Sequence, residues 1–278
     1  MTPALTARVP QGAELPAIGL GTPGLVDGQS GVTRPAADTG RAEARIKALV
    51  EEHLRLRALV ANRSKVGALA ELLQGAGRGV SDLISISIGS GMAAGIVHER
   101  RLYMGANSSA GELGHVTVHP DGPPCPCGNR GCLQQFASGP ALADLARARL
   151  REGGAGILRT LLGDHLERIN AHTVLRAALE GDPLARSVAD EAARSLGIAI
   201  ANLINLFNPE LIVLGGPVGR SAQALLEPLQ EEVRRRAQAI PLSAARIVTS
   251  ELGSEAGAAG AAARVLQQAS ELIFARAT

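Results

Sequence analysis

Three cysteines and one histidine lie close together near the middle of the chain. Cys125, Cys127 and Cys132 are the only cysteines among 278 residues, and His115 precedes the first of them by ten positions. Thiolates and a neutral imidazole are the usual ligands of tetrahedral zinc, and four such donors with no open position make a structural site. The sequence therefore predicts a structural zinc ion in the segment 111–138.

The backbone around the cysteines suits this interpretation. Pro126 restricts the chain, whereas Gly128 and Gly131 allow the sharp turns that aim three sulfurs at one point. One alternative is three neighbouring thiols that are buried or reactive and hold no metal. A disulfide is the weaker alternative, because Cys125 and Cys127 are too close in sequence for an easy bridge and the cysteine count is odd.

The same stretch resembles the zinc signature of the ROK family, whose name stands for repressors, open reading frames and kinases. The resemblance rests on GELGH at 111–115 and CPCGNRGC at 125–132. Four further segments resemble ROK segments in the family's order: GAGRGV at 75–80, ISIGSG at 86–91, NPELIVLGG at 208–216 and ELGSEAG at 251–257. The resemblance covers most of the chain from about Ala17 onward.

The family resemblance implies an α/β chain with the two-lobe fold of the actin-like ATPases, which is ribonuclease H-like. Residues 1–61 are expected to form a remnant of the N-terminal α/β lobe, to which residues 264–278 return. Residues 62–263 are expected to form the C-terminal lobe, with the zinc loop at 111–138. The first lobe of ROK kinases begins with an Asp-x-Gly-Gly-Thr phosphate loop, and this chain is expected to start after it, as an N-terminally truncated member.

One position argues against sugar phosphorylation. In the resembling kinases the strand corresponding to residues 56–61 leads into an Asn-Asp pair whose aspartate is the general base, but here the pair reads Asn62-Arg63. Phosphoryl transfer to a sugar hydroxyl needs a group that accepts its proton, and a guanidinium cannot do so. We therefore expect no catalytic residue and no enzymatic activity.

A sugar site without catalysis is still expected. The family's sugar contacts match Asn62, Glu112 and His115, and Gln134 stands where the family usually has a glutamate. Arg63 would join this site, and with Lys65 it suggests an anionic effector such as a sugar phosphate or a sugar acid. The alternative is that Arg63 turns to solvent or pairs with Glu112.

The resemblance to ROK kinases, which have similar turns beside their nucleotide, implies that two glycine-rich turns are remnants of a nucleotide site: Gly89-Ser90-Gly91 between two strands, and Gly215-Gly216 after a third. Backbone N–H groups in such turns can bind phosphate. Glycines in tight turns are more often structural. ATP binding is not expected, because the N-terminal phosphate loop would be missing.

Helices and strands must alternate to position these residues. Apolar spacing predicts helices over 42–54, 64–73, 139–152, 183–207 and 255–277, and buried strands over 17–26, 56–61, 83–88, 93–97 and 211–214. Such alternation indicates an α/β fold. The net charge of +2 gives no argument for nucleic acid or an anionic membrane, and no window has the apolar length of a membrane span or a signal peptide. A cytoplasmic protein is expected.

These observations favour a non-catalytic sugar-sensing or sugar-phosphate-sensing domain of a ROK-type transcriptional regulator, acting as a homodimer. Its DNA-binding winged helix is expected to lie outside this chain, so the chain alone should not contact nucleic acid. The Gly181-Asp182-Pro183 run also resembles the regulator branch. The alternatives are a glucokinase-like ROK sugar kinase and a degenerate remnant of one.

Overall fold

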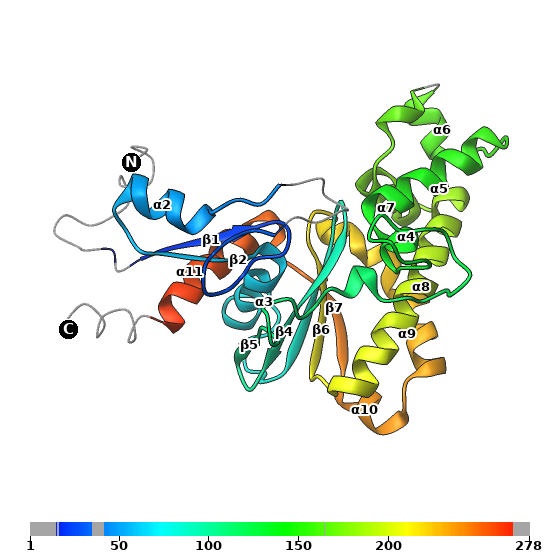
Figure 1. Cartoon of the computed structure of the whole chain (residues 1–278). Coiled ribbons are helices and arrows are strands. Elements are labelled where there is room, and N and C mark those ends of the chain that lie inside the picture. Colours follow the sequence, from blue (N-terminus) through cyan, green and yellow to red (C-terminus); the bar gives the residue numbers. More distant parts are fainter. Residues whose placement is uncertain (1–14, 16, 35–41, 164, 269–278) are drawn as a thin grey trace.

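The computed structural model describes residues 15, 17–34, 42–163 and 165–268. Within this part of the chain there are two sheets (Figure 1). The smaller pairs β1 (Ile18–Thr22) with β2 (Ala58–Asn62) in parallel, with Ile18 opposite Ala58. The larger has the order β5-β4-β3-β6-β7. Its strands are β3 (Leu83–Ile88), β4 (Met92–His98), β5 (Arg101–Tyr103), β6 (Leu211–Gly215) and β7 (Arg246–Thr249).

The small sheet is covered on both faces (Figure 1). Helix α2 (Ile46–Leu54) places Ile46 and Val50 against Val26, Ala58 and Val60 on one face. On the other face Ala61 packs against α3 (Arg63–Leu73) and α11 (Ala256–Gln267). The last strand of the first sheet thus runs directly into α3, which leads toward the larger sheet.

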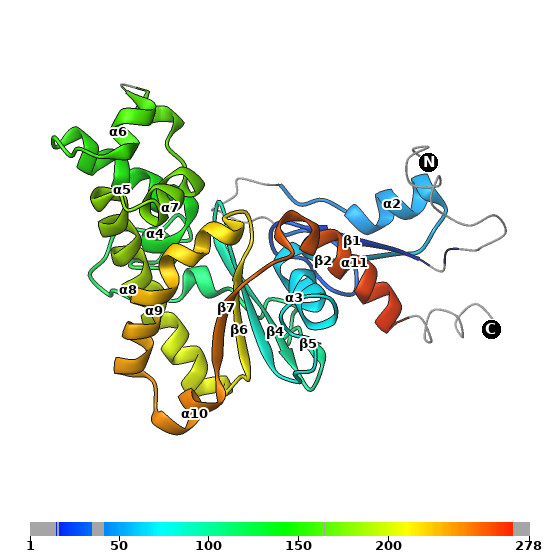
Figure 2. The ribbon, with the colours of Figure 1, turned by 180° about the vertical axis from the view of Figure 1, so that it is seen from behind.

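The larger sheet also lies between two helical layers, which Figure 2 shows from behind. One face carries the main core with α5 (Gly139–Arg151), α7 (Ala171–Leu179), α8 (Pro183–Phe207) and α9 (Gln223–Arg236). The other face packs against α3 and α11 through Leu69, Leu72 and Ala263. In β3 the isoleucines face the main core, whereas Ser85 and Ser87 line a cavity beside α3. The alternation in this strand therefore separates two covered faces rather than a core face from a solvent face.

The remaining helices are short: α4 (Gln134–Ala137), α6 (Ile157–Leu162) and α10 (Ala239–Ala244), with 3₁₀ turns at Leu113–His115, Leu166–Arg168, Gly219–Ala222 and Gly253–Glu255. No helix in the described ranges is long and apolar enough to cross a membrane.

Most expected elements are present, with shifted ends. The strand expected at 56–61 extends to Asn62, and α3 begins one residue earlier than expected, at Arg63. The helix expected over 255–277 is present from Ala256 to Gln267, and residues 269–278 lie outside the described residues. Residues 1–14 also lie outside the described residues. The expected division of the chain into two lobes at residue 61 therefore stays a prediction. Helix α11 packs against β1 and α3, which joins the two sheets through one helix pair.

Candidate functional site

The four predicted metal ligands converge in space. One donor atom from each of His115, Cys125, Cys127 and Cys132 lies within 4.8 Å of the others. The Cys127 and Cys132 sulfurs are 3.7 Å apart, and Cys125 Sγ is 3.8 Å from His115 Nδ1. A tetrahedral ion bound to sulfur at about 2.3 Å places two such ligands about 3.8 Å apart. The arrangement therefore has the dimensions of a metal site.

The electrostatics of the donors also favour a bound cation. Burial tends to raise the pKa of Cys125, but hydrogen bonds from Cys127, His115 and Cys132 lower it to about 6. Burial and the neighbouring Cys125 and Cys127 raise the pKa of Cys132 to about 12. Two neighbouring sulfurs with such unlike values are not both thiolates at neutral pH unless a cation shares their charge. The cluster can hold a metal ion.

Gln134 lies against this cluster. Its Nε2 donates to Cys125 Sγ at 3.5 Å, and the side chain is buried at the start of α4. Groups that hydrogen-bond a metal ligand orient it and adjust its basicity. Gln134, which was expected to contact sugar, thus hydrogen-bonds a predicted metal ligand, and its sequence position alone did not indicate this contact.

Asn62 and Arg63 mark the start of α3. Asn62 Oδ1 accepts from Ser64 N at 2.8 Å and from Lys65 N at 3.4 Å, which caps the helix, while Nδ2 donates to Gly24 O at 2.9 Å. Arg63 is exposed and lines a cavity of about 340 Å³. That cavity is also lined by Glu71, Ser85, Ser87, Gly215, Gly216 and Ser250. The structure thus places Arg63 beside the Gly215-Gly216 turn.

Lys65, by contrast, is buried and directed toward the loop that carries Glu112. Its Nζ donates to Ser108 O. Burial lowers the pKa of Lys65, the charge of Glu112 raises it, and Arg264 lowers it. Arg264 comes from α11 and its Nη1 lies 3.7 Å from Met104 Sδ. Neither Ser108 nor Arg264 was predicted, because no motif connects α11 with residues 104–112.

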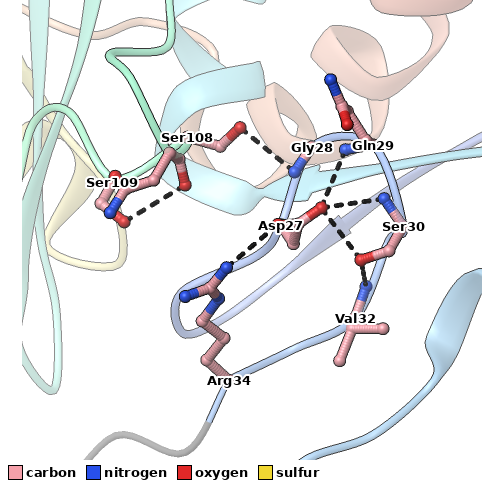
Figure 3. Close-up of polar contacts among 9 residues, drawn as sticks. Asp27, Gly28, Gln29, Ser30, Val32, Arg34, Ser108 and Ser109 are labelled. Atoms are coloured by element: carbon pink, nitrogen blue, oxygen red, sulfur yellow. Dashed lines mark hydrogen bonds and ion pairs between the residues drawn. The ribbon is translucent and has the colours of Figure 1, made fainter.

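The loop 104–112 also contacts the first sheet's loop 23–34 (Figure 3). Gly28 N donates to Ser108 Oγ at 3.1 Å. Asp27 holds its own loop by accepting from Gln29 N, Ser30 N and Ser30 Oγ at 2.9–3.1 Å, and it pairs with Arg34. These hydrogen bonds, foremost those from Ser30, lower the pKa of Asp27 to about 2.

The two glycine turns are tightly packed. Gly89 N donates to Gly91 O at 2.9 Å, and Gly89 O accepts from Gly139 N at 2.8 Å. Gly216 has a φ of 86°, and a Cβ there would lie 2.5 Å from Ser87 Oγ. Packing therefore requires Gly216 whether or not a ligand binds. Gly89 and Ser90 also line an apolar cavity of about 440 Å³ with Pro140, Ala143, Ile169 and Val218.

Comparison with known proteins finds both enzymes and regulators. The ROK family model matches residues 3–268. A glucokinase from Halalkalibacterium halodurans is 36% identical over 92% of this chain and 78% of its own length. A xylose repressor from Caldicellulosiruptor bescii is 32% identical over 90% of this chain and 62% of its own length. The chain thus spans about three fifths of such a regulator.

The similar solved structures also include both an enzyme and a regulator. A ROK glucokinase from Streptomyces griseus, in complex with glucose and AMPPNP, has a TM-score of 0.82 and 32% identity, over 95% of this chain and 86% of that one. A ROK family transcriptional regulator, a homolog of the Escherichia coli Mlc protein, has a TM-score of 0.78 and 34% identity over 87% of this chain and 60% of that one. These neighbours give the chain the actin-like ATPase fold, and the match over residues 3–268 means that it belongs to the ROK family.

Proposed function

We propose that this chain is the sugar-sensing or sugar-phosphate-sensing domain of a ROK-type transcriptional regulator and that it does not phosphorylate its ligand. The observation that carries this proposal is Arg63. It occupies the first helical position after Asn62, where the resembling kinases have an aspartate that acts as the base. A guanidinium accepts no proton, and a general base contributes about 10²–10⁴-fold to such a reaction.

The proposed sugar pocket includes Asn62, Arg63, Glu112, His115 and Gln134. A Glu112 carboxylate can accept hydrogen bonds from two hydroxyl groups. His115 Nδ1 faces the cysteine sulfurs, so Nε2 lies on the side of the ring where a sugar hydroxyl can accept from it. We propose that the ion in the cluster is zinc with a structural role, which fixes the orientation of this histidine.

Contacts between the two sheets support a sensing role. Glu112 lies at the end of the loop 104–112. In this loop Ser108 Oγ accepts from Gly28 N in the loop after β1, and Ser108 O accepts from Lys65 Nζ on α3. A ligand bound at Glu112 therefore acts on a loop that contacts both parts of the molecule. In the proposed regulator, this loop transmits ligand binding to the relative position of the two sheets.

A homodimer in the cytoplasm is part of the proposal. The end of α8 and the helix α10 expose Leu206, Phe207 and Ile240 by 78%, 45% and 85%. Gln238 N donates to Asn205 Oδ1 at 2.9 Å, which holds the two helices together. Exposed apolar groups of this kind favour burial against a second copy of the chain. The DNA-binding segment of such a regulator would lie outside this chain, and reduced thiols fit the cytoplasm.

The second candidate is a glucokinase-like kinase. It is favoured by the 36% identity to a glucokinase over 78% of that enzyme, and by the apolar cavity beside Gly89 and Ser90. Purified metal-loaded protein should be tested for glucose binding by calorimetry and for ADP release with ATP and glucose, with Arg63→Asp as a matched variant. The proposal expects sugar binding without ADP release above the sugar-free background. Sugar-dependent ADP release by the wild type would establish the kinase instead.

A further inference from the structure

We propose that Lys65 and Arg264 form a cationic subsite that binds the phosphate or carboxylate of an anionic monosaccharide. This inference rests on the proposed sugar-binding function and assigns the charged part of the ligand to two residues from different helices. Arg63, the other cation near the start of α3, lines the cavity beside Glu71 and Gly216.

The two cations share one small region between α3, α11 and the loop 104–112. Lys65 Nζ donates to Ser108 O, and Arg264 Nη1 lies 3.7 Å from Met104 Sδ. Ser108 and Met104 both flank Gly28. A Cβ built on Gly28 would lie 2.6 Å from Ser108 Oγ and 3.6 Å from Met104 Cε. The ammonium and the guanidinium therefore approach the same loop, and the charge of Arg264 lowers the pKa of Lys65.

The hydrogen-bonding capacity of this pair is only partly used within the described part of the chain. Lys65 is 2% exposed, and its ammonium has three donors. Arg264 Nε is buried and has no hydrogen-bond partner among the described residues. The thioether of Met104 is a weak acceptor, so it does not replace an oxygen anion. Buried donors without partners are rare in proteins, and a bound anion is one explanation for such a donor.

The charge balance leads to the same conclusion. Glu112 is the carboxylate that acts on Lys65 in the described ranges, whereas two cations are present. Burial lowers the pKa of Lys65 and of Arg264, which means that the surroundings of both disfavour positive charge. An anion offsets such a cost when it accepts hydrogen bonds from both groups, and the guanidinium suits a carboxylate or phosphate.

The position of Glu112 beside Lys65 indicates that the anionic group belongs to a ligand with hydroxyl groups, such as a sugar. A carboxylate beside the cations can accept hydroxyl hydrogen bonds, and the same carboxylate repels a ligand that is only an anion. The pair of cations and the adjacent carboxylate thus fit a molecule with hydroxyls at one end and a negative group at the other. Sugar phosphates and sugar acids share this chemistry.

Calorimetry on the metal-loaded protein can test the subsite with glucose, glucose 6-phosphate, glucuronate and inorganic phosphate. Wild type should bind at least one of the two anionic sugars at least tenfold more tightly than glucose. Arg264→Met should abolish that preference without weakening glucose binding, and Arg264→Lys should retain part of it. Arg78→Met is the matched control, since Arg78 is exposed just beyond α3. Lys65→Met provides a second, independent variant.

Thermal unfolding without ligand separates a binding role from a structural one. Removing the charge of Arg264 should leave the ligand-free Tm unchanged or raise it, because the cost of burying part of a cation is removed. A lower ligand-free Tm in Arg264→Met together with an intact preference for the anionic sugar would overturn the subsite.

The outcomes also separate this inference from the proposed function. Glucose binding as tight as that of both anionic sugars overturns the subsite and leaves sugar sensing intact. Stabilisation by inorganic phosphate that is lost in Arg264→Met, with no sugar bound, supports the cationic pair and overturns sugar sensing. Failure of every probe to bind overturns both.

Discussion

The contact between α3 and α11 gives a sharp test of the architecture, because it positions both Lys65 and Arg264. Gly260 on α11 faces the backbone of Val66 on α3. A Cβ at Gly260 would lie 1.7 Å from the Val66 carbonyl oxygen and 2.3 Å from its carbonyl carbon. Backbone atoms cannot rotate away, so the Gly260→Ala substitution must push the two helices apart. Gly67, on the same stretch of α3, has no atom within 4 Å of a built Cβ.

The two glycines should therefore respond in opposite directions. Overpacking costs about 1–3 kcal/mol when side chains can adjust, and the backbone contact puts Gly260→Ala near 3 kcal/mol. Gly67→Ala should stabilise by about 0.5–1 kcal/mol, because alanine is the better residue inside a helix. For a chain of this size about 1 kcal/mol shifts Tm by about 2–4 °C. Gly260→Ala should lower Tm by about 6–12 °C, and Gly67→Ala should raise it by about 1–4 °C.

Urea unfolding followed by circular dichroism measures both effects in the same buffer as the thermal scans. Gly260→Ala should also weaken the binding of the anionic sugar, since Arg264 lies one helical turn beyond the substitution. Equal stability changes in the two variants, or a Gly260→Ala variant as stable as wild type, would refute this packing of α11 on α3. The loss of ligand preference in Gly67→Ala would refute its use as a neutral control.

Three further predictions concern the metal cluster, the loop at Asp27 and the exposed face of α10. Cys132→Ser should lose the bound ion, measured by mass spectrometry, and lower Tm by roughly 6–12 °C. The reason is that an ion joining His115 to Cys132 closes a loop of the chain, which stabilises the folded state by about 3 kcal/mol. Asn129→Ala in the same loop should keep the ion. The Asp27 carboxyl should titrate near pH 2 by NMR. Because its pKa is lowered on folding, its contribution is complete above about pH 4 and is lost as pH falls through 2; a midpoint near 4 would contradict the loop contacts. Ile240→Glu should convert a dimer to a monomer in light scattering, and a monomeric wild type would remove the proposed interface.

The sequence was most informative where local rules and packing agree. Asp182 and Pro183 predicted the start of a long helix, and α8 begins there with Asp182 Oδ1 accepting from Ala185 N at 2.9 Å. Its end at Asn208, in the left-handed region, also follows the expected pattern. Strands β5 and β7 were not predicted, because three or four residues that include arginine carry no clear alternation. These two strands form because their backbones pair with β4 and β6, which the local sequence does not indicate.

The candidate site divides in the same way. The spacing of the cysteines and the histidine predicted their convergence, because side chains in one short glycine-rich segment cannot lie far apart. The hydrogen bond from Gln134 to Cys125 depends on where α4 begins relative to Cys125, and the sequence spacing does not give that distance. The role proposed for Arg264 could not be predicted from the sequence at all. This residue lies in an alanine-rich helix far along the chain from Lys65, and only the packing of α11 on α3 brings the two cations to one loop.

Arg63 is the residue that local stability explains least. It occupies the first turn of α3, where the helix dipole favours acidic side chains by about 0.3–1 kcal/mol and disfavours basic ones. No acidic residue occupies that turn. An aspartate at this position would stabilise the helix and could accept a proton, so replacing it with arginine gives up both properties. The arginine instead lines a cavity that Glu71 and Ser250 also line, and Ser250 Oγ donates to the buried Glu71 carboxylate. The proposed function accounts for this arginine, because a domain that binds a sugar without phosphorylating it needs no base at the start of α3.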